Sequence, residues 1–204
     1  MPISCPINFD VTSLRSEVKS MYSRVADAPQ GDFHFHRGPT YAATMLRYDA
    51  AELSLLPARV TSSFAGVANP HAIAPLPVGG TAVDIGCGAG TDLLLAARHV
   101  GPSGRAIGVD MTEAMRGLAT EGARLCGLAN VDVRAGDATA LPVADGSVDV
   151  VISNGVLNLV PEKERAISEI ARILKPQGRV QIGDIIIGTE LDDEALADID
   201  LWTG

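Results

Sequence analysis

The chain has 204 residues, a hydrophobic content of 47% and a formal net charge of −9 at pH 7. This length predicts one domain, or one domain with an appendage, and the apolar content suffices for a sizeable core. The acidic balance argues against a nucleic-acid partner, which needs a basic surface. No apolar run approaches the roughly 20 residues of a membrane span, so we expect no membrane partner.

The amino terminus lacks the charged and apolar regions of a signal peptide. The three cysteines, Cys5, Cys87 and Cys126, are widely spaced and form no C-x-x-C pair. This spacing fits neither a disulfide framework nor a metal site, and it suits a reducing compartment. We therefore expect a cytoplasmic protein without a bound metal.

Residues 1–77 precede the main domain and are expected to form a helical cap or lid. Apolar residues recur at spacings of three and four over residues 10–27, which predicts a helix. A short helix is expected near residues 40–46. The proline- and glycine-rich loop 75–80 then marks a natural boundary, so that the main domain spans residues 78–204.

From residue 81 onward, apolar strands alternate with helices. Five such strands separated by helices predict an α/β fold with a doubly wound, mainly parallel sheet covered on both faces. The strands are expected just before Gly86 and over residues 105–110, 131–135, 148–153 and 179–187, and the helices over residues 91–99, 112–125 and 161–174.

A glycine-rich turn follows the first of these strands. Gly86, Gly88 and Gly90 allow positive φ angles and a close approach of the backbone to a ligand. Asp84 stands two residues before this turn, where its charge would repel a pyrophosphate and attract an amine and a sulfonium. The pattern therefore favours S-adenosylmethionine over NAD. The alternative is an ordinary glycine turn.

Two further acidic residues follow neighbouring strands. Asp110 ends the second strand, where a carboxylate can accept bonds from both hydroxyls of a ribose. Asp137 follows Gly136 after the third strand and can accept a bond from an adenine amino group. Alternatively, Asp110 and Glu113 form a capping box, and Gly136 and Asp137 form a simple turn.

These motifs together resemble those of class I S-adenosylmethionine-dependent methyltransferases, which have a Rossmann-like fold. The match is closest to the arsenite methyltransferase branch and covers about residues 63–204. The residues that carry it are 84–90, 108–112, 136–137, 141–154 and 174–178, and the narrower resemblance rests on residues 100–105 and 152–159.

The resemblance implies which residues contact the cofactor. Ser153 and Asn154 would face its sulfonium end, and Tyr22 would close over it. Met111 would pack on the adenine, although Met111 and Tyr22 are also ordinary packing residues. The remaining cofactor-binding residues implied are Asp84, Gly86, Cys87, Gly88, Asp110, Gly136, Asp137 and Ala138.

The resemblance does not extend to the substrate site. Arsenite methyltransferases hold trivalent arsenic with cysteine thiolates, which are soft ligands. Val67 and Gly155 stand where two of these cysteines are expected, and a third would lie just past Gly204. His34 and His36 are weak candidates for substrate contact and better suited to that than to metal binding, since no ligand cluster follows them.

We therefore expect a methyltransferase that acts on a small molecule, and no catalytic base can be assigned. The alternatives are an arsenite methyltransferase-like enzyme with altered thiol ligands, a catalytically silent cofactor-binding subunit, and a nucleotide-binding oxidoreductase.

The resemblance implies two more strands after the fifth, and we expect both to be missing from this sequence. The strand 179–187 is suited to burial on both faces, and a helix is expected within residues 190–200. If nothing follows Gly204, this strand lies at the sheet edge and favours pairing with a second chain. The alternative is that the sequence is a fragment of a longer enzyme that has two further strands and part of the substrate site.

Overall fold

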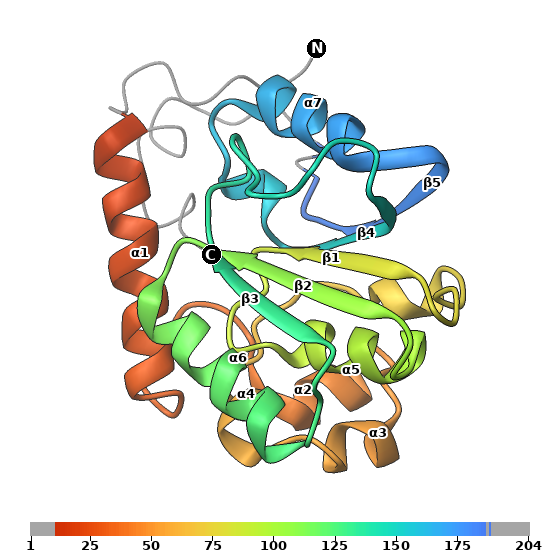
Figure 1. Ribbon diagram of the computed structural model, residues 1–204. Coiled ribbons are helices and arrows are strands. Elements are labelled where there is room, and N and C mark those ends of the chain that lie inside the picture. The colour runs from red at the N-terminus through yellow and green to blue at the C-terminus, as the bar shows by residue number, and fades with distance from the viewer. Residues whose placement is uncertain (1–10, 187, 189–204) are drawn as a thin grey trace.

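A computed structural model describes residues 11–186 and 188. Five parallel strands form one sheet in the order β3-β2-β1-β4-β5, with helices on both faces (Figure 1). The doubly wound α/β fold expected from the sequence is therefore confirmed. The strands are β1 Thr81–Ile85, β2 Arg105–Asp110, β3 Val131–Ala135, β4 Val148–Asn154 and β5 Leu174–Gly183.

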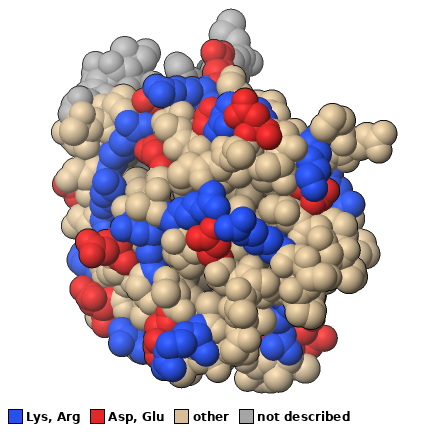
Figure 2. All heavy atoms as spheres, viewed as in Figure 1, with Lys and Arg blue, Asp and Glu red and all other residues tan. Residues whose placement is uncertain are grey.

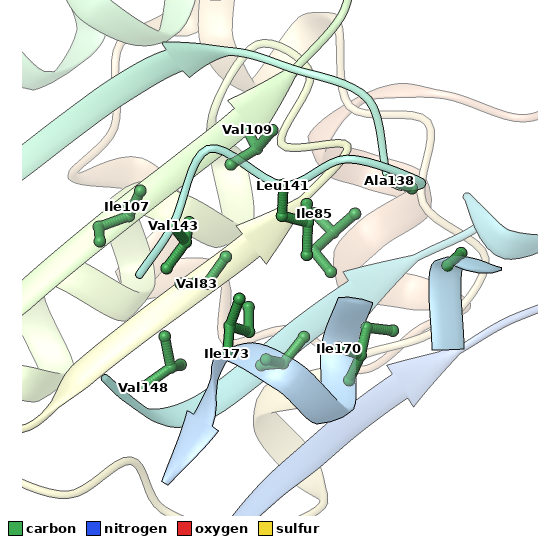
Figure 3. Close-up of a cluster of buried hydrophobic side chains, with 12 residues drawn as sticks. Val83, Ile85, Ile107, Val109, Ala138, Leu141, Val143, Val148, Ile170 and Ile173 are labelled. Carbon is green, nitrogen blue, oxygen red and sulfur yellow. The ribbon is translucent and has the colours of Figure 1, made fainter. Parts of the chain in front are cut away.

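The centre of the sheet is apolar on both faces. β1 pairs with β2 on one side and with β4 on the other, so it is shielded from water by two neighbours and two layers of helices. On one face, Val83 and Ile85 of β1 contact Ile170 and Ile173 of helix α7 (Lys163–Ile173) within one buried cluster (Figure 3). This packing fixes the carboxyl end of β1, where the glycine turn begins.

The opposite face is covered by two helices. α5 (Thr91–Val100) follows the glycine turn directly and buries Leu93 and Ala97 against the sheet. α6 (Glu113–Leu125) follows β2 and places Ala119 in the same cluster. Both helices begin at the carboxyl ends of strands, which is the side where ligands bind in open parallel sheets.

The residues before β1 are helical, and they share a core with the sheet domain. α1 (Val11–Asp27) packs along α6, and Figure 1 shows it standing beside the carboxyl ends of the strands. Three short helices, α2 (Gly38–Thr44), α3 (Ala50–Ser54) and α4 (Ala58–Ser62), pack against α5 and α6. Two single turns, Pro70–Ala72 and Leu157–Leu159, complete the helical elements of the described residues.

The last strand differs from the prediction. β5 begins at Leu174, before the expected start at residue 179, and residues 175–178 form an irregularity within it, where Gln177 has a φ of 69°. The expectation that this strand is buried on both faces is wrong, because Val180 is 44% exposed. Within the described residues β5 pairs with β4 alone, so its other edge has no strand partner among them.

Two predictions lie outside the described residues, namely those on Cys5 and on a helix within residues 190–200. In the part of the chain that is described, no helix combines the length and the apolar character that crossing a membrane requires.

Candidate cofactor site

A cavity lies at the carboxyl ends of β1, β2, β3 and β4, and α1 borders it. Its walls contain twelve of the residues singled out in the sequence, namely Tyr22, Asp84, Gly86, Cys87, Gly88, Asp110, Met111, Gly136, Asp137, Ala138, Asn154 and Gly155. The fold thus brings together residues from five separate segments. The cavity also includes Arg15, Phe64 and Asp92, which sequence reasoning missed.

The glycine turn lines the cavity, and several of its backbone amides already donate hydrogen bonds to acceptors within the protein. Gly86, Gly88 and Gly90 have φ angles of 68°, 51° and 98°. The amides of Gly86 and Cys87 donate to the carbonyl of Val109, and the amide of Gly88 donates to Asp110 Oδ2 at 2.9 Å. Because a phosphate at such a turn is held by free backbone N–H groups, this turn is unsuited to a pyrophosphate.

Asp84 is a buried carboxylate with unsatisfied hydrogen-bonding capacity. Its side chain is 3% exposed, and Oδ2 has no hydrogen-bond partner among the described residues. Burial, followed by the charges of Asp92 and Asp110, raises the pKa of Asp84 well above its usual range. A buried polar atom without a partner is costly, so its position in the cavity wall points to a ligand that carries a donor or a positive charge.

Asp110 is oriented by the backbone on both sides of it. Its Oδ1 accepts a hydrogen bond from the Thr112 amide at 2.7 Å, and its Oδ2 accepts the one from Gly88. Burial raises its pKa, and these backbone bonds oppose the shift. A carboxylate has about four lone-pair directions, so two remain for a ligand. Thr112 is the residue before α6 but makes no side-chain cap.

The wall on the side of β3 is tied to α1. Arg15 Nε lies 3.3 Å from Asp137 Oδ2, and its Nη2 lies 3.2 Å from Glu162 Oε2. Asp137 also accepts bonds from the amide and hydroxyl of Thr139, and these bonds together with Arg15 and Lys19 hold its pKa below the usual range despite burial. In Figure 2, Lys and Arg side chains gather along the side of the molecule on which α1 lies.

Tyr22 of α1 lies inside the cavity wall. Its ring stacks on Phe35 with the centroids 6.1 Å apart, and burial, with a smaller contribution from Asp110, raises its pKa to about 12. Cys87 is buried in the wall of the same cavity, where burial and the charges of Asp110 and Asp84 raise the pKa of the thiol. Both groups therefore stay neutral at physiological pH and offer polar but uncharged atoms.

The end of β4 holds a loop of the amino-terminal segment in place. Asn154 Oδ1 accepts hydrogen bonds from the amides of Val67 and Ala68 at 2.8 and 3.1 Å. A side chain at Gly66 would overlap Asn154, so the contact is close. Ser153 does not face the cavity as expected. It is 0% exposed and lies outside the cavity wall, since adjacent residues of a strand point to opposite faces.

Asn154 belongs to a buried polar group that joins segments distant in sequence. Its Nδ2 donates to Asp92 Oδ2 at 2.9 Å, and Tyr48 Oη donates to Asp92 Oδ1 at 2.6 Å. His71 Nε2 lies 3.2 Å from the same oxygen, and the His71 ring meets that of His99 edge-on at a centroid distance of 5.2 Å. Only Asp92 and Asn154 of this group reach the cavity.

The four candidate substrate residues are not brought together. Gly155 lines the cavity, and a Cβ at Gly155 would lie 3.3 Å from Val67 Cγ1, so these two positions are neighbours, although Val67 is outside the cavity wall. His34 and His36 are exposed and lie outside it as well. Their rings contact Phe35 and Tyr41, and the described residues contain no metal-binding group of His, Cys, Asp or Glu.

Comparison with known proteins identifies methyltransferases. Residues 77–202 match the family described as "Methyltransferase domain". The chain is 47% identical over 139 residues to an arsenite methyltransferase of Halobacterium salinarum, which covers 68% of this chain and 36% of that protein. It is 39% identical over 105 residues to a demethylmenaquinone methyltransferase of Lactobacillus johnsonii, covering 51% of this chain and 43% of the relative.

Solved structures agree with this assignment. An arsenic(III) S-adenosylmethionine methyltransferase from Chlamydomonas reinhardtii is 33% identical and superposes with a TM-score of 0.63, over 71% of this chain and 51% of that one. The chain thus spans well under half the length of the two relatives above and about half of this structure. The chain belongs to the methyltransferase domain family and has the fold of the class I S-adenosylmethionine-dependent methyltransferases.

Proposed function

We propose that the cavity binds S-adenosylmethionine and that the protein of which this sequence is all or part transfers its methyl group to a small-molecule acceptor. One observation carries the proposal. The glycine turn uses its amides internally and is surrounded by the carboxylates of Asp84 and Asp110, so it disfavours a pyrophosphate and favours a cationic ligand. S-adenosylmethionine carries a sulfonium and an ammonium group, whereas NAD would bring an anionic pyrophosphate to such a turn.

Each part of S-adenosylmethionine has residues of the cavity that suit it. Asp110, with two lone-pair directions left, would accept the ribose hydroxyls. Asp137 and the backbone near Ala138 would receive the adenine, and Met111 would pack on its ring. The unpartnered Oδ2 of Asp84 would face the amino-acid end. A Cβ at Gly88 would meet no atom within 4 Å, so the turn leaves room beside the cavity.

Methyl transfer requires the protein mainly to position the acceptor and the cofactor. The cofactor supplies a methyl group activated on a sulfonium. The side chains around β4 and the segment before β1 would align the acceptor about 3–3.5 Å from that carbon and exclude water. Phe64 and Val156 provide apolar wall for this purpose, and Asn154 holds the segment in place. No base is assigned, since one is needed only when the acceptor starts protonated.

Arsenite is not the acceptor that this site favours. Two relatives are named for arsenic, and Val67 and Gly155 stand at neighbouring positions where the resemblance places thiolates. Oxygen donors do not replace thiolates on a soft centre at similar strength. We expect little conversion of arsenite in the presence of glutathione and S-adenosylmethionine. If mass spectrometry of the products shows robust methylation of arsenite, then other residues hold the metalloid.

Equilibrium binding tests the proposed function. Titration calorimetry with S-adenosylmethionine and, separately, with NAD is expected to show binding of the first alone. Binding of NAD and not S-adenosylmethionine would overturn the proposal and favour an oxidoreductase. A catalytically silent subunit is distinguished by a second assay, in which a labelled methyl group from the cofactor is followed into an extract of small molecules. Binding without any transfer would support the silent subunit.

A further inference from the structure

The charges of the cavity are distributed unevenly. Among the described lining residues, Arg15 is the one Lys or Arg side chain, and it is paired with Asp137 and Glu162 on the β3 side. The β1 and β4 side carries two buried carboxylates, Asp84 and Asp92, which are 3% and 6% exposed. No lining cation faces this pair within the described residues.

Asp92 is surrounded by three polar side chains from distant parts of the sequence. Tyr48 Oη and Asn154 Nδ2 donate to its two oxygens at 2.6 and 2.9 Å, and His71 Nε2 lies 3.2 Å from Oδ1. The two hydrogen bonds from Tyr48 and Asn154 leave at least one lone-pair direction of the carboxylate for the cavity.

The unpartnered oxygen of Asp84 is a second, independent indication that a ligand binds at this end of the cavity. Its Oδ2 is buried and has no partner among the described residues, although the residue lies in the cavity wall. The charge of Asp92 is one of the causes that raise the pKa of Asp84, so the two carboxylates interact across this end. A cationic ligand group would satisfy the free oxygen and relieve the repulsion between the two charges.

We propose that Asp84 and Asp92 make this end of the cavity select for positive charge, so that Asp92 favours the sulfonium cofactor over its neutral sulfide product. The inference rests on the proposed function. S-adenosylmethionine and S-adenosylhomocysteine differ by one methyl group and one positive charge, so their affinity ratio isolates the contribution of charge. In a water-poor site, one carboxylate within several ångströms of a cation changes affinity by about tenfold or more.

Calorimetry with both ligands on the wild type, Asp92→Asn and Tyr48→Phe tests the inference. For Asp92→Asn we expect the affinity for S-adenosylmethionine to fall at least about tenfold and that for S-adenosylhomocysteine to fall no more than about threefold. Tyr48→Phe is the matched control, because it removes one hydrogen bond to Asp92 and retains both carboxylates. Its affinity ratio is expected to stay within about twofold of the wild-type ratio.

An equal loss for both ligands, or no loss for either, would overturn charge selection by Asp92. If Asp92→Asn does not fold, as judged by circular dichroism, Asp92→Ser serves in its place and is expected to show the same selective loss. Wild-type protein that binds neither ligand would refute the proposed function itself. Wild-type binding combined with an unchanged ratio in the variants would refute the inference alone.

Discussion

Asp110 accepts hydrogen bonds from the amides of Gly88 and Thr112 and retains two lone-pair directions for a ligand. Asp84 has an oxygen without any partner among the described residues. The two side chains lie at the ends of adjacent strands, yet they differ in what their removal should do. Asp110 is part of the turn, whereas Asp84 is unsatisfied until a ligand binds. The difference can be measured.

Asp110→Ala is expected to weaken binding of S-adenosylmethionine by about 1.5–3 kcal/mol, because it removes charge-assisted hydrogen bonds to the ribose. Titration calorimetry measures the change. Asp110→Asn keeps the shape and one acceptor and should lose less. Asp145→Ala, which removes an exposed carboxylate paired with Arg172, is the control and should bind normally. Unchanged affinity in Asp110→Ala would place the ribose elsewhere.

Asp84→Asn is expected to stabilise the protein without ligand while it weakens cofactor binding. Burial and the nearby carboxylates raise the pKa of Asp84, so the folded state binds a proton more tightly than the unfolded state. Its contribution to stability is therefore present at acidic pH and is lost as the pH rises above the unfolded-state pKa of about 4. Between pH 4 and pH 7, the midpoint temperature of thermal unfolding should fall less in Asp84→Asn than in wild type. Parallel curves for the two proteins would contradict this explanation.

At the scale of elements, α1 is attached to the cavity by packing and by charge. Val25 and Ala26 pack beside Ala89 and Met115, while Arg15 joins the helix to Asp137 and Glu162. Exposed ion pairs contribute at most about 1 kcal/mol each, so the apolar contacts hold the helix and Arg15 fixes its position over the β3 side. The adenine expected at Asp137 would have to share that carboxylate with Arg15.

Arg15→Met is expected to loosen the amino-terminal half of α1, because it removes both ion pairs and retains the apolar part of the side chain. Hydrogen exchange followed by mass spectrometry should show faster exchange over the first turns of α1. Arg24→Met is a matched control, since Arg24 lies on the same helix and contacts Phe33 and Met21 instead of the cavity. Equal exchange in wild type and Arg15→Met would show that the ion pairs do not hold this helix.

At the scale of the whole molecule, the sheet and most of the cavity could be predicted from the sequence. Asp84 and Asp110 lie at the ends of apolar strands and Asp137 just after one, and parallel strands bring their carboxyl ends to one edge. The contributions of Arg15 and Asp92 could not be predicted, because their partners Asp137 and Tyr48 lie 122 and 44 residues away. Asp92 alone reads as an ordinary acidic residue in the first turn of a helix.

Pairing of two chains through β5 stays a prediction. The outer edge of β5 has no strand partner within the described residues, and Val180 of this strand is 44% exposed. Open strand edges favour pairing with another chain, and a lysine on such a strand disfavours it. Light scattering of the 204-residue chain is expected to give the mass of a dimer, and Val180→Lys that of a monomer. A fully active monomer of the wild-type chain would refute the pairing.

The most direct test of the account is a crystal structure of this chain with S-adenosylhomocysteine. We predict the ribose hydroxyls at Asp110, the adenine beside Met111 and Asp137, and the amino-acid end at the free oxygen of Asp84. The amides of Gly86, Cys87 and Gly88 should keep the internal hydrogen bonds they make here. A ligand seated away from the ends of β1, β2 and β3, or one held by those amides, would contradict the account.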